Sequence, residues 1–336
     1  MIDYLPLRDR QSAQSFRHMT FAAYYATLDF EPTSPPPLVV GARAGGLPAG
    51  LALARRRAGD VTAELLSVFV APDRRGQGIA AALVRAVEAE CAREQVPALT
   101  AKYMGGLATS AAVEHILAKG GWSQPCKRTT VLTFPLEKVR AQAGFERSSR
   151  PPRGFDILPW TRLAAAERTE IRVSNARLPW IEADLVPFDH EADLDTEVSV
   201  ALRSGGAVVG WCIGHRSADA WRVSCAFVRE DARRAGAMLP LVREALERAS
   251  RAGYENGMVT APVWHAWLHE FAHHWIAPLS TIVRETFGVY KLLIDDPALE
   301  QALALRTAHA YRPDPYRATT PAGVSTPMSF PATGIQ

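Results

Sequence analysis

The chain has 336 residues, 48% of them hydrophobic and 22% charged, and its formal net charge is +3. This length allows two ordinary domains. Lysines and arginines are spread along the chain and do not form the concentrated basic face that nucleic-acid binding needs. No apolar run approaches the ~20 residues that span a bilayer. The four cysteines lie far apart without a CxxC pair, as is typical of free thiols in a cytoplasmic protein. We therefore expect a cytoplasmic protein with neither a nucleic-acid nor a membrane partner.

An internal repeat organises the chain. Four segments of the first half recur in the second half in the same order and at nearly constant offsets: 2–7 as 155–160, 40–46 as 200–206, 70–78 as 228–236, and 83–90 as 241–248. Small changes of offset are what loop insertions and deletions produce, and several matches in one order indicate a duplicated unit. We therefore predict two copies of one domain, each of ordinary domain size.

The repeat and the composition between its copies set the predicted boundaries. Residues 1–139 form the first copy and 155–296 the second, and the polar, proline-containing stretch 140–154 connects them. Residues 297–336 begin with a helical pattern and continue into a tail rich in Pro, Thr, Ser and Gly. Such a tail cannot form a core by itself.

Strand and helix patterns alternate within each copy. In the first copy we predict strands at 3–7, 38–43, 51–57, 62–70, 98–103 and 129–134, and helices at 12–28, 79–94 and 109–119. On the second of these helices Leu83 and Val87 share an apolar face. This order predicts a layered α/β fold with a mixed sheet.

The segment VFVAPDRRGQGIAAALV carries the clearest functional signal. A buried strand ends at Val70, and because Pro72 has no N–H to donate, strand pairing stops there. Gly76 and Gly78 lack a Cβ, so the backbone can turn and approach a ligand closely. The helix that follows offers unpaired N–H groups and a partial positive charge, which suit an anion. A turn without a ligand is the alternative, and the two common nucleotide-binding patterns are absent.

This segment resembles the acyl-coenzyme A signature of the GNAT superfamily of N-acetyltransferases, Q/R-x-x-G-x-G/A, which Arg75, Gly78 and Ala80 match. Together with the repeat, it makes the chain similar to the tandem, two-copy type, a layout like that of mycothiol-synthase-like proteins. The resemblance implies two GNAT-like domains, each a mixed, mostly antiparallel sheet flanked by helices. It also implies transfer of an acyl group, usually acetyl, from coenzyme A to an amine.

The resemblance further implies which residues hold the coenzyme. In the family, the end of the strand pairs with the pantetheine arm, and the amides of the loop and first helical turn hold the pyrophosphate. The corresponding residues here are Val68, Phe69 and Val70 on the strand, and Arg75, Gly76, Gln77, Gly78, Ile79 and Ala80 in the loop and helix. The implied co-substrate is acetyl-coenzyme A or another acyl-coenzyme A. The implied partner is a small-molecule amine, and we expect no metal and a monomer or homodimer.

Two side chains are candidates for proton transfer. Glu64 lies on the strand that leads into the loop, where many relatives carry a catalytic glutamate. Because its neighbours are apolar, we expect a raised pKa that suits a general base, with an outward-facing charge as the alternative. The tyrosine that the family often uses as an acid is missing, since Leu117 occupies its position. Tyr103 and His115 are the nearby substitutes, of which we favour Tyr103, and protonation by solvent is the alternative.

The second copy departs from this pattern. Its loop has Arg234 where the first copy has Gly76, and Met238 where the first has Ala80. The position that matches Glu64 is Arg222. We expect the bulky side chains to keep the backbone away from phosphates, and we therefore predict that the first copy is active and the second degenerate.

A competing motif lies in the second copy. His269, Glu270 and His273 match HExxH, in which two histidines bind zinc and the glutamate activates a water molecule. The repeat assigns this segment to the last helix of the copy, and Trp267 and Phe271 supply an apolar face. We predict a packed helix, with a zinc hydrolase that uses the three motif residues as the less favoured alternative.

The stretch 182–197 holds seven acidic residues. It has the charge to attract a cationic amine, although a solvated loop is the favoured interpretation. The sequence as a whole predicts an acyl-coenzyme A-dependent N-acyltransferase, in which a small amine or amino-acid-like metabolite attacks the thioester directly. A non-catalytic acyl-coenzyme A-binding sensor is the alternative from a different class.

Overall fold

The computed structural model describes residues 1–30, 35–147, 150–218 and 220–308. The first repeat contributes the strands β1 (Ile2–Leu7), β2 (Leu38–Ala44), β3 (Leu47–Arg56), β4 (Ala63–Val70), β5 (Ala98–Met104) and β6 (Cys126–Pro135). The second contributes β7 (Phe155–Pro159), β8 (Val200–Ser204), β9 (Ala207–Ser217), β10 (Ala220–Val228), β11 (Asn256–Pro262) and β12 (Ile282–Leu292). The tail beyond residue 308, for which we predicted no core, lies outside the described residues.

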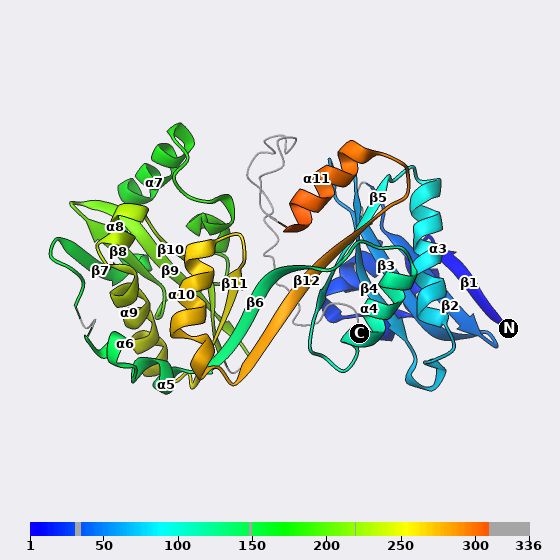
Figure 1. Ribbon diagram of the computed structural model, residues 1–336, viewed down its shortest axis with the longest axis horizontal. Helices are drawn as coiled ribbons and strands as arrows, with labels where there is room; N and C mark the ends of the chain where they lie inside the picture. The colour runs from blue at the N-terminus through cyan, green and yellow to red at the C-terminus, as the bar shows by residue number, and fades with distance from the viewer. Residues whose placement is uncertain (31–34, 148–149, 219, 309–336) are drawn as a thin grey trace.

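All of these strands belong to one sheet. Its order is β1-β2-β3-β4-β5-β12-β6-β11-β10-β9-β8-β7, so the first five strands of each repeat lie in matching order on either side of β12 and β6 (Figure 1). Strand β4 runs parallel to β5 and β10 runs parallel to β11, whereas the other recorded pairs are antiparallel. The predicted repeat and the mixed, mostly antiparallel sheet are confirmed, but the two copies share a single continuous sheet.

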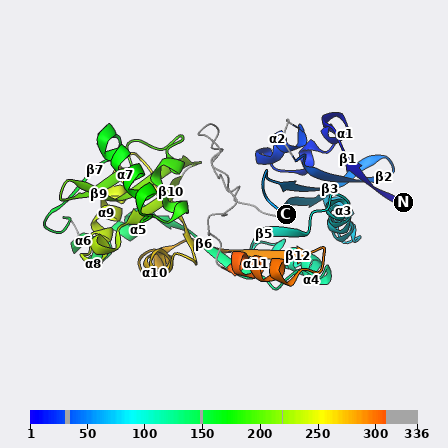
Figure 2. The same ribbon diagram turned by 90° about the horizontal axis from the view of Figure 1, so that it is seen from above.

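Helices cover the sheet within each repeat. The first repeat has α1 (Arg10–Gln14), α2 (Tyr25–Leu28), α3 (Ile79–Arg93), α4 (Ser110–Lys119), α5 (Leu136–Arg140) and α6 (Ala143–Arg147). The second has α7 (Ala165–Arg177), α8 (Glu230–Arg234), α9 (Met238–Arg251), α10 (Ala266–Trp275) and α11 (Pro297–Ala308). In the first repeat, α1 and α2 lie on the opposite side of the sheet from α3 (Figure 2). Throughout the described ranges, no helix is both long and apolar enough to cross a membrane.

The two repeats exchange their last strands. Strand β12 of the second repeat lies between β5 and β6 of the first and is antiparallel to both. Its Val289 is buried in the same core as Leu83 of α3. Strand β6 of the first repeat instead pairs with β11, and its Phe134 is buried in the core that contains Leu241 of α9. In each repeat, the hydrophobic core beneath the long helix, α3 or α9, is therefore completed by a strand from the other repeat.

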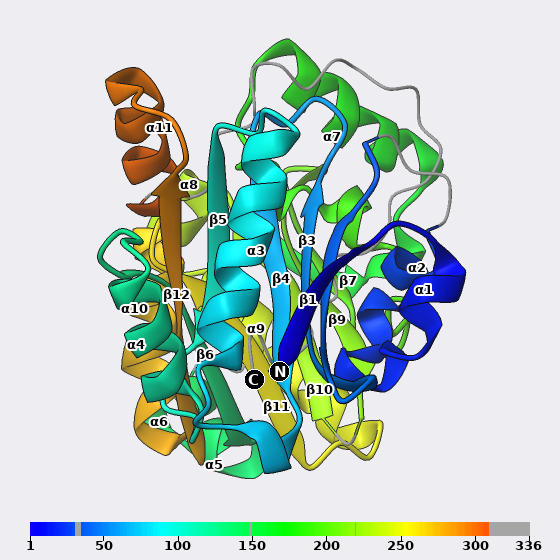
Figure 3. The ribbon, with the colours of Figure 1, turned by 90° about the vertical axis from the view of Figure 1, so that its right-hand side faces the viewer.

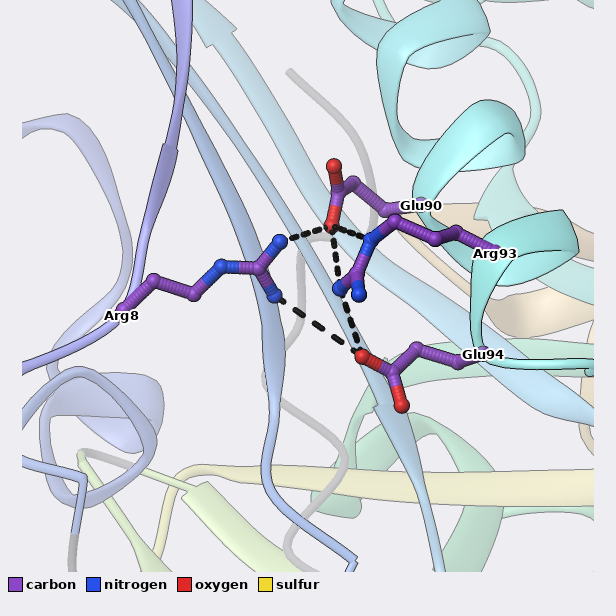
Figure 4. Close-up of polar contacts among 4 residues, drawn as sticks. All are labelled: Arg8, Glu90, Arg93 and Glu94. Atoms are coloured by element: carbon purple, nitrogen blue, oxygen red, sulfur yellow. Dashed lines mark hydrogen bonds and ion pairs between the residues drawn. The ribbon is translucent and has the colours of Figure 1, made fainter.

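Helix α3 anchors the functional loop to the sheet. It runs along β3 and β4 (Figure 3) and buries Ile79, Leu83 and Val87, which recur at the spacing of one helix face. At its other end Arg8, on the segment after β1, bonds Glu90 and approaches Glu94, and Arg93 pairs with the same two carboxylates (Figure 4). Exposed ion pairs of this kind stabilise a fold little. The buried face is therefore what holds the start of the helix in place.

The predicted connector is partly structured. Residues 140–154 contain α6, whose Phe145 is fully buried in the core of the second repeat. The predicted helical region 12–28 consists instead of α1, α2 and two short 3-10 turns. Because β12 and β6 cross between the repeats, the division into domains at 1–139 and 155–296 stays a prediction.

We expect residues 1–139 on their own to lack a cooperative unfolding transition. Without the second repeat, β5 loses β12, its neighbour along its whole length, and β6 loses both of its neighbours, β12 and β11. Unpaired strand edges and apolar side chains are therefore exposed. Chemical denaturation with far-ultraviolet circular dichroism and light scattering measures this. The control is the same fragment co-expressed with residues 280–308, which carry β12 and α11. A stable monomer formed by residues 1–139 alone would contradict the dependence on the exchanged strand.

Candidate functional site

The loop between β4 and α3 has the geometry that its glycines predict. Strand β4 ends at Val70, and a short 3-10 turn at Pro72–Arg74 follows. Gly76 and Gly78 have φ angles of +75° and +77°, and Gly78 is the N-cap of α3. These positive φ values are strained for any residue with a Cβ. The loop from residue 72 to residue 78 is exposed, so its backbone is accessible to a ligand.

The amide groups of this loop are available to a ligand. Among the hydrogen bonds of the described residues, none is donated by the backbone N–H groups of residues 76–80. The first helical hydrogen bond runs from the N–H of Ala82 to the carbonyl of Gly78, at 3.1 Å. Arg75 folds back, and its Nε donates to the carbonyl oxygen of Val70 at 3.2 Å. Convergent free amides at a helix N-terminus suit a phosphate or pyrophosphate.

Strands β4 and β5 diverge beside this loop. They pair at only three positions, Ala63–Leu65 with Leu99–Ala101. Beyond these positions β4 continues to Val70 paired with β3, and β5 continues to Met104 paired with β12. The facing edges of the two strands thus have no strand partner in the described part of the chain. An extended amide-containing arm can pair with such an edge. The predicted coenzyme residues Val68, Phe69 and Val70 lie on the β4 side of this opening.

Glu64 lies where β4 and β5 are still paired, and it is engaged in an ion pair. Its Oε1 lies 2.9 Å from Nζ of Lys102 on β5, and its side chain is 25% exposed. Burial favours the neutral acid, but the positive charges of Lys102, Arg57 and Arg55 outweigh burial and lower the pKa of Glu64. The expected raised pKa is therefore wrong, because a cation on the neighbouring strand compensates the buried carboxylate.

Tyr24 is close enough to respond to this carboxylate. Burial, followed by the negative charge of Glu64, raises the pKa of the Tyr24 hydroxyl. Arg55 lies directly opposite Glu64 in the β3–β4 pair. Glu64 is thus surrounded by cations and a protonated phenol, an environment that keeps it ionised at neutral pH.

Tyr103 lies on the other face of the sheet from Glu64. It follows Lys102 on β5, and successive residues of a strand point to opposite faces. Its side chain is 2% exposed and its ring stacks on Phe287 of β12 at 5.6 Å. Burial, together with the charge of Glu114, raises the pKa of Tyr103 well above its ordinary value. A buried phenol of raised pKa is a poor proton donor to a thiolate, so these observations argue against the predicted acid, which stays a prediction.

The loop of the second repeat is closed by its own hydrogen bonds. The amides of Ala235, Gly236 and Ala237 donate to the carbonyls of Asp231, Arg233 and Ala232, at 3.1, 2.9 and 3.1 Å. Helix α8 thus satisfies the groups that are free in the first repeat, although Gly236 keeps a positive φ of +79°.

The side chains that we expected to block this second loop point elsewhere. The Arg234 side chain is 78% exposed and pairs with Glu230, and Met238 is buried in the core. The expected steric block is therefore wrong. The hydrogen bonds within the loop account for the difference between the repeats.

The HExxH segment forms α10, between β11 and β12 as the repeat predicts. Nε2 of His269 and Nε2 of His273 lie 3.4 and 3.3 Å from the hydroxyl of Thr130 on β6. His265 instead hydrogen-bonds Asp184 at 2.8 Å. In the described ranges, no three His, Cys, Asp or Glu residues are placed to hold a metal ion together.

Several acids of the stretch 182–197 have partners within the fold. Asp184 also accepts from Trp264, Glu191 pairs with Arg168, and Asp195 accepts from Tyr254. These contacts fit a structural role for the acidic stretch.

A groove of about 530 Å³ is lined by elements of both repeats. Its lining comes from the segment between α4 and β6, from β12 and from α11, and includes Trp122, Lys291 and Glu300. None of the residues predicted for the coenzyme or for proton transfer lines it.

Sequence reasoning missed two side chains on the Glu64 face of the sheet, Lys102 and Arg128, and one beside Tyr103 on the other face, Phe287. Lys102 lies two residues after Thr100, the β5 residue that pairs with Glu64. A single lysine on a strand does not by itself indicate a functional residue. Arg128 belongs to the exchanged strand β6, and Phe287 belongs to β12. No local pattern placed either of these strands beside β5.

Comparison with known proteins agrees with this geometry. Residues 6–104 match the Acetyltransferase (GNAT) family. No curated protein matches the chain. A solved tandem GNAT protein from the clavulanic acid biosynthesis pathway is similar, with 16% identity, a TM-score of 0.58, and 88% of this chain and 100% of that chain covered. A GCN5-related N-acetyltransferase from Sphaerobacter thermophilus has 17% identity, a TM-score of 0.57, and coverage of 87% and 96%. These likenesses confirm the predicted tandem GNAT fold.

We expect the substitution Gly78→Glu to weaken coenzyme A binding by at least about 30-fold, which is about 2 kcal/mol. A side chain at this positive φ strains the loop, and its carboxylate repels the pyrophosphate. Isothermal titration calorimetry measures the affinity and should give one site per chain.

The matched control is Gly236→Glu, which introduces the same strain at a φ of +79° in the second repeat. We expect it to leave coenzyme A affinity unchanged. Two equivalent sites, or equal losses in both variants, would contradict the assignment of the first loop.

Proposed function

We propose that the first repeat, whose residues 6–104 match the GNAT family of acetyltransferases, is an acyl-coenzyme A-dependent N-acyltransferase. The chain as a whole has the tandem GNAT fold. Its acyl group is acetyl or another acyl group carried by coenzyme A. Its acceptor is a small amine or an amino-acid-like metabolite, which attacks the thioester directly.

One observation carries this proposal. The N–H groups of residues 76–80 donate to no protein acceptor within the described residues, and residues 76–78 at the start of α3 are exposed. The opening between β4 and β5 begins beside them. A pyrophosphate site next to an unpaired strand edge suits a molecule that combines a diphosphate with an extended amide arm, as coenzyme A does. Residues 68–70, 75 and 76–80 are the proposed contacts.

Glu64 is the proposed acceptor of the amine proton. The amine nitrogen forms a bond to the thioester carbonyl carbon, the carbon–sulfur bond breaks, and the sulfur leaves as a thiolate. The proton lost by the nitrogen passes to the ionised Glu64 through water, and solvent protonates the thiolate. Holding the two reactants in one orientation supplies much of the rate, and the general base contributes a further factor.

Lys102 sets the protonation state of this base. The ion pair keeps Glu64 ionised at neutral pH, so the base is ready before the amine binds. A lowered pKa also makes Glu64 a weaker base. This observation supports, as the second candidate, a protein that binds acyl-coenzyme A without transferring its acyl group.

The release of free thiol from acetyl-coenzyme A in the presence of a panel of amines separates these two functions. Acetyl transfer to an amine, identified by mass spectrometry, supports the N-acyltransferase. Tight coenzyme binding without thiol release for any amine would support the sensor.

We expect Glu64→Gln to lower kcat by about 10²–10⁴-fold and to leave coenzyme A affinity unchanged, because the amide keeps the shape of the side chain but accepts no proton. Steady-state kinetics and calorimetry measure the two quantities. The control is Glu137→Gln on the exposed face of α5. A variant of Glu64 with wild-type kcat from pH 6 to pH 9 would remove Glu64 from the mechanism.

We expect Lys102→Met to move the acidic limb of the kcat/KM profile to higher pH. The lysine opposes the effect of burial, so its removal raises the pKa of Glu64 and fewer molecules carry the ionised base at a given acidic pH. Lys102→Arg should keep the limb near its wild-type position. An unshifted limb in Lys102→Met would contradict the role of this ion pair.

A further inference from the structure

A row of residues crosses four neighbouring strands on the face of the sheet that carries Glu64. Glu64 on β4 is paired with Lys102 on β5, at 2.9 Å. Lys102 lies directly opposite Gly288 on β12, and opposed residues share a face of the sheet. A Cβ at position 288 would lie 2.7 Å from Cδ of Arg128 on β6, so the Arg128 side chain occupies the space above this glycine.

The position of Arg128 is set by both repeats. It lies at the irregularity in the β12–β6 register, between Lys127 and Thr129. Its Nη1 donates to the last turn of α11, to the carbonyls of Arg306 and Thr307 at 3.5 and 3.4 Å. Its guanidinium carbon lies 5.5 Å from the centre of the Trp264 ring in the second repeat. The side chain is thus held between a helix and an aromatic ring.

Arg128 has no carboxylate partner within the described part of the chain. It forms none of the recorded ion pairs, and its Nε and Nη2 donate no recorded hydrogen bond. Its side chain is half-buried, and burial lowers the pKa of Arg128. A partly buried charge without a counter-ion costs free energy. Glu64 acts on this charge without forming an ion pair with it, so among the described residues the guanidinium has no anion in direct contact.

Its neighbour Trp264 is also fixed. The indole Nε1 donates to Oδ2 of Asp184 at 3.0 Å, and Nε2 of His265 lies 2.8 Å from Oδ1 of the same carboxylate. Asp184 and its two partners belong to the second repeat. This repeat therefore contributes the aromatic ring that packs against Arg128, although its own loop is closed.

We propose that Arg128 binds a carboxylate of the acceptor, so that the acceptor is an amine that also carries a carboxylate, as an amino acid does. This inference rests on the proposed function and specifies its substrate class. The planar guanidinium matches a carboxylate through two parallel hydrogen bonds. Its single positive charge also matches one carboxylate rather than a doubly charged phosphate, since Glu64 already neutralises Lys102.

The spacing of the row suits a small acceptor. Neighbouring strands lie about 4.8 Å apart, so the backbones of β4 and β6 are separated by about 14 Å. Cγ and Cδ of Arg128 lie over Gly288 of β12, one strand nearer to Glu64 than the Arg128 backbone on β6, and the charge of Glu64 acts on the guanidinium. An acceptor that lies across β5 can then present its amine toward Glu64 and its carboxylate toward Arg128.

The test measures binding of acetylated products, with coenzyme A present, to wild type and to Arg128→Gln. The probes are a set of N-acetylamino acids and the matched N-alkylacetamides, which lack the carboxylate. We expect at least one N-acetylamino acid to bind wild type and to bind Arg128→Gln at least 10-fold more weakly, with Arg128→Lys restoring part of the affinity. The matched amides should bind both proteins equally. The control is Arg162→Gln, an exposed arginine with no recorded partner, and unchanged coenzyme A affinity shows that each variant is folded.

Three results would overturn the inference: no N-acetylamino acid binds wild type, Arg128→Gln binds them as wild type does, or N-acetyl-O-phosphoethanolamine binds wild type more tightly than every carboxylate.

Steady-state kinetics with amine acceptors distinguish a failure of this inference from a failure of the proposed function. A rise in acceptor KM of at least 10-fold in Arg128→Gln, for carboxylated amines only, supports the carboxylate site. Thiol release that fails for every amine would contradict the N-acyltransferase, while the binding data would still decide the role of Arg128.

Discussion

The pairing of β12 with β5 is the interaction on which the rest of the structure depends. Strand β5 diverges from β4 after Ala101, and β12 supplies its only continuous neighbour in the described sheet. Beyond Ala101 strand β5 follows β12 while β4 follows β3, and the opening beside the loop lies between them. The same exchange places β6 in the other half, where it buries Phe134. The two repeats are therefore a single structural unit, although each carries its own helices and its own core.

The exchange also decides the chemistry around the proposed base. Glu64 and Lys102 come from the first repeat, Gly288 comes from the second, and Arg128 comes from the first by way of the shared strands. Trp264 of the second repeat then packs against Arg128. The second repeat, whose loop amides are hydrogen-bonded within the loop, can in this way still shape the proposed substrate region of the first repeat. This arrangement gives a physical reason for keeping two copies when one loop is closed.

The difference between the two loops is a difference in hydrogen bonding. Both have a glycine with positive φ before the helix, Gly78 and Gly236. In the first repeat a short 3-10 turn ends at Arg74, the amide of Arg75 donates to the carbonyl of Pro72, and the amides of residues 76–80 donate to no acceptor among the described residues. In the second, α8 runs to Arg234 and its carbonyls accept from the equivalent amides. One additional helical turn is enough to remove an anion site, because a helix N-terminus binds anions only through amides that the protein leaves unpaired.

The sequence by itself determined what depends on neighbouring residues: the repeat, the order of strands and helices, the glycine turn and the start of α3. These features follow from side-chain periodicity and from φ angles that only glycine adopts easily. Only the tertiary structure decided which strand lies beside β5, and with it the ion pair that lowers the pKa of Glu64, the burial of Tyr103 against Phe287 and the position of Arg128. An apolar strand pairs equally well with its own repeat or with the other one, because backbone hydrogen bonds do not depend on residue type. The choice is made by packing between segments more than 150 residues apart, which no local pattern records.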